Sequence, residues 1–155
     1  MPQPAYWSLA FVDIPAPDYA DMSIAVLPQG ATDDPAEWAR ALFSVHSMPG
    51  WIRAAMGLRQ LVVPLIGIPR ADRDVFAVKR VEGNEALLSV DDVHLDFRCG
   101  VGVDAETRIV RVTTTVRLKG WRGRLYFFPV RLAHPIVVHS MLKRAQRRLK
   151  LPVEA

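Results

Sequence analysis

The clearest hydrophobic pattern lies in the second half of the chain, where apolar and polar residues alternate. From Val93 to Val103 every second residue is apolar, and polar residues or glycines stand between them. A period of two residues predicts a β-strand with one buried face. The same alternation runs from Val110 to Lys119 after a short turn, which predicts an antiparallel neighbour in the same sheet.

Shorter apolar runs predict four further strands. Turn residues separate these runs from their neighbours, and residues 82–85 have the composition of a hairpin turn between two of them. The runs bring the predicted total to six strands. They are Met22–Leu27, Val75–Val81, Ala86–Asp91 and Leu125–Val130.

Helical spacing occurs in three other segments. Asp34-Pro35-Ala36-Glu37 is typical of a helix start, because the aspartate can cap the first turn and proline suits the first helical position. A second helix is expected from Trp51 to Val62, ending at Pro64. The last is an amphipathic helix of about fifteen residues that opens at His134-Pro135, with apolar residues on one stripe and bases opposite.

The order of these elements predicts an α+β domain in which a curved antiparallel sheet surrounds a long C-terminal helix. The chain has 155 residues and no internal repeat, so we expect a single domain over residues 22–150. Residues 1–21 contain four prolines and are expected to form an arm without regular structure. Residues 151–155 form a short tail.

This order resembles the helix-grip fold of the START and Bet v 1-like superfamily, in which a bent sheet and a C-terminal helix enclose an apolar cavity. That fold usually has seven strands, so one strand would be absent or hidden near residues 61–68. Asp91-Asp92-Val93-His94-Leu95-Asp96-Phe97-Arg98 also resembles a bacterial family known only as a domain of unknown function, and the likeness runs from about Asp21 to Leu149. The resemblance implies a cytosolic single-domain protein and no established activity.

Composition adds an asymmetry of charge. Half of the residues are apolar and 23% are charged, as in a folded globular chain. The six acids among residues 1–37 meet no base, whereas the rest of the chain holds all 20 lysines and arginines. Bases are densest from Lys143 to Lys150, where they could dock on acidic lipid or an acidic partner, or remain solvated on the last helix.

Three polar residues two apart, His94, Asp96 and Arg98, share one face of the longest predicted strand. An imidazole, a carboxylate and a guanidinium on one surface could form an acid–base site that also anchors an anion. The alternative is a ladder of cross-strand ion pairs, in which Asp96 contacts Arg111 or Arg117. A partner interface on this face is a third alternative.

The preferred functional hypothesis is a module that binds a small apolar or amphipathic ligand between the sheet and the C-terminal helix. Apolar side chains of the sheet would hold the ligand, and Thr114 and Tyr126 would supply the few polar contacts that orient it. The candidate ligand-binding residues are Phe97, Thr114, Val116, Tyr126 and Phe128.

Two alternatives stay open. The first is an enzyme of the same fold, a cyclase, hydrolase or isomerase, with His94 or His134 as general base and Arg98 or Arg124 holding an oxyanion. The second is an interaction protein that docks through its basic C-terminal helix. The binding module is preferred to the enzyme because no motif in the sequence names a reaction.

Motifs for cofactors and metals are missing from the sequence. Gly100-Val101-Gly102-Val103 lacks the third glycine of a dinucleotide loop, so these glycines are expected to mark a bulge or bend. The four histidines show no metal-binding spacing, and Cys99 falls on the apolar face as a core residue. We expect no metal and no cofactor. The sequence pI is near 9.6, but no nucleic-acid-binding module accompanies it, so DNA and RNA are not expected partners.

The compartment follows from cysteine usage and hydropathy. A single cysteine fits a reducing compartment. No uncharged stretch reaches the roughly 20 residues of a transmembrane helix, and the N-terminus has no basic region of a secretory signal. We expect a cytoplasmic protein without a transmembrane segment. Its expected partners are a small apolar ligand and either a second copy or another protein.

Overall fold

A computed structural model describes residues 7–44, 47–48, 50, 53–54 and 76–150 of the chain. It confirms an α+β domain with an antiparallel sheet and a long C-terminal helix. The elements in chain order are α1 (Leu9–Asp13), β1 (Tyr19–Val26), α2 (Pro35–Leu42), β2 (Arg80–Glu82), β3 (Glu85–Asp91), β4 (Leu95–Asp104), β5 (Ile109–Leu118) and α4 (Gly120–Leu149).

The described strands form one five-stranded antiparallel sheet in the order β1-β5-β4-β3-β2. Strands β2 to β5 follow one another along the chain, whereas β1 pairs with the last strand, with Tyr19 opposite Val116 and Val26 opposite Ile109. This pairing brings the beginning of the chain to the strand that leads into α4.

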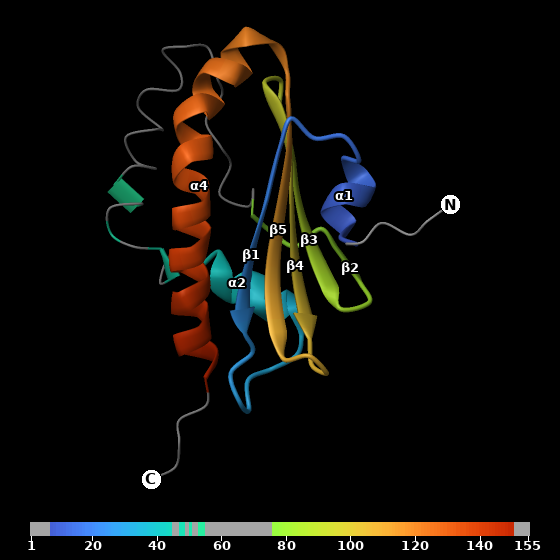
Figure 1. Cartoon of the computed structure of the whole chain (residues 1–155), viewed down its shortest axis with the longest axis vertical. Coiled ribbons are helices and arrows are strands. Elements are labelled where there is room, and N and C mark those ends of the chain that lie inside the picture. The colour runs from blue at the N-terminus through green and yellow to red at the C-terminus, as the bar shows by residue number, and fades with distance from the viewer. Residues whose placement is uncertain (1–6, 45–46, 49, 51–52, 55–75, 151–155) are drawn as a thin grey trace.

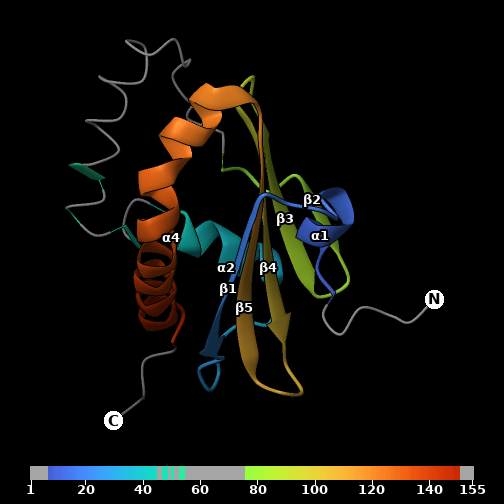
Figure 2. The same ribbon diagram turned by 45° about the horizontal axis from the view of Figure 1, so that its top comes forward.

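Helices cover both faces of the sheet. In Figure 1 the sheet lies between α4 and α2 on one side and α1 on the other, and Figure 2 shows the same order of layers. We call the face toward α2 and α4 the inner face and the face toward α1 the outer face. The inner face holds the main core, because alternate residues of the strands point to it. Its buried residues are Leu27, Trp38, Ala39, Ala41, Leu42, Ala86, Leu88, Cys99, Val101, Val103, Val110, Val112, Val138, Met141, Leu142 and Ala145.

The predicted helix start at Asp34 is confirmed in α2. The Asp34 carboxylate accepts a hydrogen bond from the backbone N–H of Ala36 at 2.9 Å, and Pro35 occupies the first turn. Trp38 is fully buried and its indole Nε1 donates to the carbonyl of Thr32 at 2.8 Å. The satisfied N–H lets this large ring lie in the core without an unpaired polar atom.

The strand expected from Leu125 to Val130 is wrong, because this segment belongs to α4. Gly120, with a φ of +69°, turns the chain after β5 in a backbone conformation that glycine adopts without steric cost. The helix then continues through the expected start at His134 to Leu149. A run of consecutive apolar residues has no period of its own, so only its continuation into Leu132 and Ile136 reveals helical spacing.

The expectation of an arm without regular structure is also wrong in part. Ser8 caps the short helix α1 by accepting from the backbone N–H of Ala10, and Leu9 and Ala10 are buried against Leu87 on the outer face. The hydroxyl of Thr115 in β5 donates to the carbonyl of Ala10 at 2.9 Å and holds the helix against the sheet. Proline-rich composition argued against a long helix, but it did not exclude one turn held by tertiary contacts.

The hairpin of β2 and β3 confirms the turn predicted at residues 82–85. The strand expected from Val75 to Val81 is wrong over residues 76–79, which form a turn and irregular chain, because β2 begins only at Arg80. Most of the helix expected from Trp51 and any strand near residues 61–68 lie outside the described residues.

The two glycines of β4 do not mark a bulge, because β4 pairs without interruption with β3 and β5. A Cβ on Gly100 would overlap the buried carboxylate of Glu85, and one on Gly102 would lie 2.8 Å from Nε of Arg111. Because glycine has no Cβ, Gly100 leaves room for the side chain of Glu85 and Gly102 leaves room for that of Arg111 on the outer face.

Candidate functional site

A polar group interrupts the apolar inner face where β1 meets β5. Asp21 of β1 lies directly opposite Thr114 of β5, and Thr114 lies opposite Cys99 of β4. The alternation of burial along β1 turns Tyr19 and Asp21 toward the inner face and Ala20 and Met22 away from it. Antiparallel pairing thus gathers a phenol, a carboxylate, a hydroxyl and a thiol on one surface.

His134 of α4 joins this group across the domain. Its Nδ1 lies 2.7 Å from Oδ2 of Asp21, and the two side chains are 15% and 13% exposed. The hydroxyl of Tyr19 donates to the same Oδ2 at 2.5 Å. The Tyr19 ring also packs edge-on against His134 and Phe127, with centroid distances of 5.9 and 5.1 Å. We call Tyr19, Asp21, Thr114 and His134 the inner polar cluster.

Two oxygen atoms of the inner polar cluster have no hydrogen-bond partner among the described residues. They are Oδ1 of Asp21 and Oγ1 of Thr114, and both are buried. A buried polar atom without a partner costs about 1–3 kcal/mol, so such atoms are rare unless something else satisfies them. The Thr114 hydroxyl lies near enough to Asp21 to lower the pKa of that carboxyl, but neither oxygen has a hydrogen bond of normal geometry among the described residues, so one small polar group could contact both.

The pKa values at this site favour a charged Asp21 beside a neutral Tyr19 phenol and a neutral Cys99 thiol. Burial raises the pKa of Asp21, but hydrogen bonding and charge at His134, together with the Tyr19 and nearby Thr114 hydroxyls, lower it further, so it falls below its ordinary value. Burial, reinforced by the bond to Asp21, raises the pKa of Tyr19 well above its usual range. Burial also raises the pKa of the Cys99 thiol to about 12. The cluster therefore presents a carboxylate beside a phenol and a thiol that both keep their protons at neutral pH.

Two of the residues proposed from sequence for an acid–base site, Asp96 and Arg98, form ion pairs. Asp96 is almost fully buried, and its carboxylate lies 2.6 Å from the guanidinium of Arg117 and 2.6 Å from the ammonium of Lys119. The predicted cross-strand pair of Asp96 with Arg117 is thus confirmed. The neighbouring Arg98 contacts Asp13 of α1 at 2.9 Å and Asp91 at 2.7 Å.

His94 lies just outside the strand. It precedes β4, and its backbone carbonyl accepts from the N–H of Lys119 at 2.8 Å. Because β4 begins at Leu95, only Asp96 and Arg98 of the expected triad lie within the strand. His134, in contrast, pairs with a carboxylate that the sequence did not single out.

The proposed ligand-binding residues divide between two places. Thr114 and Val116 are buried on the inner face and Phe97 is half-buried beside them. Tyr126 and Phe128 lie on α4 and not on the sheet, and Phe128 is 64% exposed. The expectation that Phe128 lines the apolar face of the sheet is wrong, since its segment is helical.

Tyr19 and Asp21 were missed because residues 1–21 were assigned to an arm. The signal available was an alternation that leads into the apolar run, because Tyr19, Asp21 and Ser23 stand two apart, as on one face of a strand. No local pattern pairs Asp21 with His134, since 113 positions separate them.

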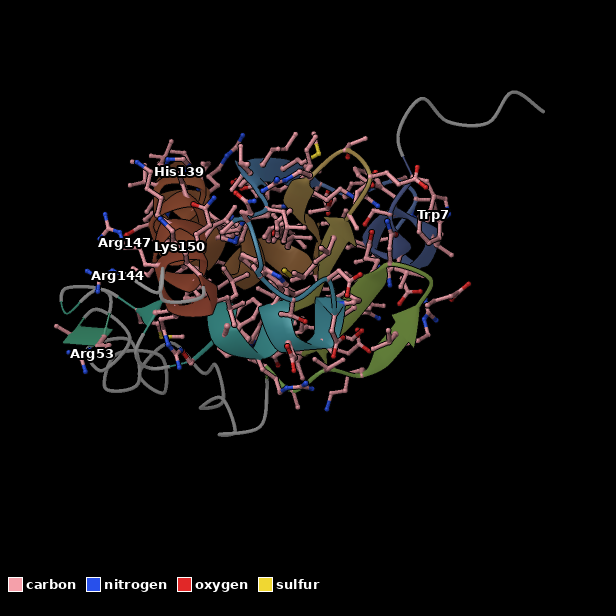
Figure 3. The ribbon with its side chains drawn as sticks, turned by 90° about the horizontal axis from the view of Figure 1, so that it is seen from below. Trp7, Arg53, His139, Arg144, Arg147 and Lys150 are labelled. Atoms are coloured by element: carbon pink, nitrogen blue, oxygen red, sulfur yellow. The ribbon has the colours of Figure 1, made fainter. Side chains whose placement is uncertain are left out.

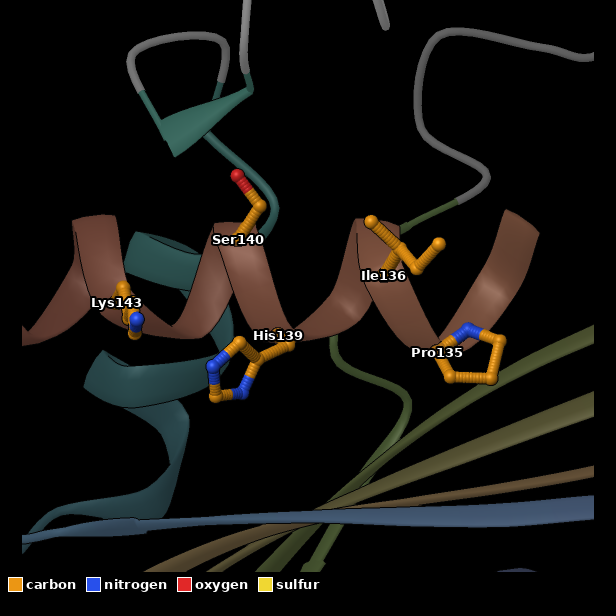
Figure 4. Close-up of a pocket in the computed structure, with 5 residues that line it drawn as sticks. All are labelled: Pro135, Ile136, His139, Ser140 and Lys143. Carbon is orange, nitrogen blue, oxygen red and sulfur yellow. The ribbon is translucent and has the colours of Figure 1, made fainter.

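A shallow depression lies on the exposed side of α4. Figure 4 shows the five residues that line it, Pro135, Ile136, His139, Ser140 and Lys143. All of them belong to α4. Within the described part of the chain, no three His, Cys, Asp or Glu side chains gather closely enough to hold a metal ion.

Among the described helices, α4 is long and apolar enough, by length and composition alone, to cross a membrane. Core helices of soluble proteins can pass the same test. The sequence expectation overlooked this segment, because Arg131 interrupts an otherwise uncharged stretch from Leu125 to Leu142.

These features define an α+β domain whose antiparallel sheet and C-terminal helix meet at a partly buried tyrosine–aspartate–histidine cluster. The family described as "Protein of unknown function (DUF2867)" matches residues 14–141, and the chain belongs to that family. The matched region contains the whole inner polar cluster. No curated protein and no solved structure matches the chain significantly.

Proposed function

We propose that this protein is a helix-grip domain that binds a small amphipathic ligand between the inner face and α4. The pairing of the first strand with the last, and a long C-terminal helix on one side of the sheet, support the fold assignment. The observation that carries the function is the pair of unpartnered buried oxygens, Oδ1 of Asp21 and Oγ1 of Thr114, on an otherwise apolar surface.

The hydrogen-bonding capacity of these two oxygens indicates which polar group the ligand should carry. An ionised carboxylate only accepts hydrogen bonds, whereas a hydroxyl both donates and accepts. The ligand should therefore carry a donor, either a hydroxyl or a protonated amine. A ligand carboxylate would meet the negative charge of Asp21. The apolar part would contact Phe97 and Val116, which flank Thr114 on the inner face.

A homologous series of probes tests this selection. Octanol, octylamine and octanoate share one apolar chain and differ only at the head group. Any of them that binds the folded state raises the melting temperature, and the increase grows with the ratio of free ligand concentration to Kd. We expect stabilisation by octanol or octylamine and none by octanoate at the same concentration. Stabilisation by octanoate alone would contradict the role of Asp21.

Two adjacent threonines supply a matched pair of variants. Thr114→Val keeps the side-chain shape and removes a hydroxyl that has no protein partner among the described residues, so stability should be unchanged or higher while the probe-induced shift disappears. Thr115→Val removes the bond to the carbonyl of Ala10 on the other face, so stability should fall while the shift persists. The proposal fails if both variants keep the full shift.

The proposed setting is the cytoplasm, without a metal, a cofactor or a nucleic-acid partner. The single cysteine supports a reducing compartment. Cys99 is buried, consistent with a packing role.

A second candidate function, hydrolysis by an enzyme of the same fold, rests on the pairing of His134 with Asp21. A carboxylate that holds one ring nitrogen orients an imidazole for proton transfer at the other. With p-nitrophenyl butyrate as the probe, His134→Gln should lower turnover by about a hundredfold or more, whereas exposed His139→Gln should leave it unchanged. Equal turnover by the two variants would exclude His134 as the base.

A further inference from the structure

Helix α4 carries a second apolar face that packs against nothing described. Five large side chains on it are between 61% and 68% exposed. They recur every three or four residues and therefore form one stripe along the helix. We call this set the α4 stripe: Trp121, Leu125, Phe128, Leu132 and Ile136.

The α4 stripe lies opposite the face that holds the helix in the domain. The buried residues of α4 include Phe127, Val138, Met141 and Leu142, which fall on the other side of a helix with 3.6 residues per turn. His134 lies on this buried side and pairs with Asp21. Helix α4 is thus apolar on two sides, and only one of them packs against other described residues.

The charge of α4 is uniformly positive. Its 30 residues contain seven bases and no acid. Arg122 places its guanidinium over the ring of Trp121, 5.5 Å from the centroid, so base and apolar anchor adjoin at the start of the helix. At the other end, Arg144 and Arg147 project from the helix near Lys150, on the opposite side of the molecule from Trp7 (Figure 3). The seven bases are Arg122, Arg124, Arg131, Lys143, Arg144, Arg147 and Arg148.

We propose that α4 docks the protein on an anionic lipid surface, with the α4 stripe in the interface and the bases near the headgroups. Exposed Trp, Phe and Leu with flanking Lys and Arg are the residues of helices that lie in the plane of a membrane. Each base close to an anionic surface adds to the attraction. The depression that contains Ile136, His139 and Lys143 continues the stripe and brings a base beside an apolar contact.

Two other occupants fit the structure less well. A second copy of the chain packed through the same stripe would bring seven bases toward seven bases with no acid on either helix to pair with them. A helix spanning the bilayer would have to leave the sheet, which would expose the core residues of α4 and break the contact of His134 with Asp21. Anionic lipid instead complements both the charge and the apolar stripe while the fold stays intact.

Sedimentation with lipid vesicles tests the proposal. The full chain is mixed with vesicles of equal parts phosphatidylcholine and phosphatidylglycerol, and separately with vesicles of phosphatidylcholine alone. We expect binding to the anionic vesicles that weakens as salt is raised, because salt screens exposed charges. Binding that is equal for both vesicles, or that ignores salt, would overturn the role of the bases.

A matched pair of double variants tests the stripe itself. Leu125→Gln with Leu132→Gln should lower vesicle binding by about a hundredfold without changing the melting temperature, since both residues are exposed in the folded protein. Met22→Gln with Ile24→Gln changes two residues of similar exposure on the outer face of β1 and should leave binding unchanged. Equal losses in the two variants would overturn the proposal. A dimer that the first variant abolishes, without vesicle binding by the natural chain, would overturn it in favour of a second copy.

Discussion

The substitution Gly123→Ala tests the contact between the first turn of α4 and the loop before β4. Gly123 is buried, and an added Cβ would overlap the backbone carbonyl oxygen of His94 and lie 3.2 Å from its carbonyl carbon. That carbonyl accepts the hydrogen bond from the N–H of Lys119, one residue before the helix. Backbone atoms on both sides leave little freedom to relax, so the helix start must move away from the loop.

The net effect is a difference between two terms. In an unobstructed helix, alanine is more favourable than glycine by about 1 kcal/mol. Forcing an extra methyl into a packed contact costs about 1–3 kcal/mol, and weakening the hydrogen bond to His94 costs about 1 kcal/mol more. We expect a net loss of about 2 kcal/mol. For a chain of this length, that lowers the melting temperature by about 4–8 °C.

Thermal and urea unfolding followed by circular dichroism measure the change, with Gly50→Ala as the control. At the exposed Gly50 an added Cβ would approach only the end of the Arg53 side chain, at 4.0 Å, so no loss of stability is expected. If Gly123→Ala raised the melting temperature, the packing of the α4 start on His94 would be refuted.

Three further substitutions or titrations follow from the polar contacts. Asp96→Asn should lower stability by about 1–2 kcal/mol in urea unfolding, because it weakens two charge-assisted bonds to partly exposed partners; a neutral result would mean that Asp96 is merely solvated. The folded-state pKa of Asp21 is lowered, so its contribution to stability is present above the unfolded pKa of about 4 and is lost as pH falls through the folded value. Melts from neutral to acidic pH should show this fall, and Asp21→Asn should flatten it. Cys99, with its pKa raised to about 12, should resist thiol reagents at mildly alkaline pH until the protein is unfolded; rapid labelling of the folded protein would contradict its burial.

The strands with regular alternation could be predicted from the chain alone. In β4 and β5 the alternating apolar residues Cys99, Val101, Val103, Val110 and Val112 share the core on the inner face, and burial of that face selects apolar residues at a period of two. The start of α2 could also be predicted from the sequence, because capping by Asp34 depends on residues adjacent in sequence. The sequence left Arg111 and Arg117 open as cross-strand partners of Asp96, and the register of β4 and β5 selects Arg117.

Two of the wrong secondary-structure predictions, for residues 125–130 and for α1, concern segments whose structure depends on tertiary packing. Residues 125–130 are almost all apolar because α4 is apolar on two sides, one in the core and one exposed. The helical period of 3.6 residues therefore cannot be seen in this segment. Helix α1 is one turn long and depends on Glu85, whose buried carboxylate accepts from the hydroxyl of Ser8 and the backbone N–H of Leu9. Contacts between residues more than seventy positions apart leave no local pattern.

The sequence by itself determined the class of the domain, the order of its alternating strands and the basic character of its C-terminal helix, because these depend on neighbouring residues and on composition. Only the tertiary structure decided that β1 pairs with β5, that Asp21 and Thr114 face one another and that His134 reaches them from α4. It also decided which apolar side of α4 remained outside. The sequence of a helix with two apolar sides does not show which side will pack in the core, since the surface it packs against comes from strands distant in the chain.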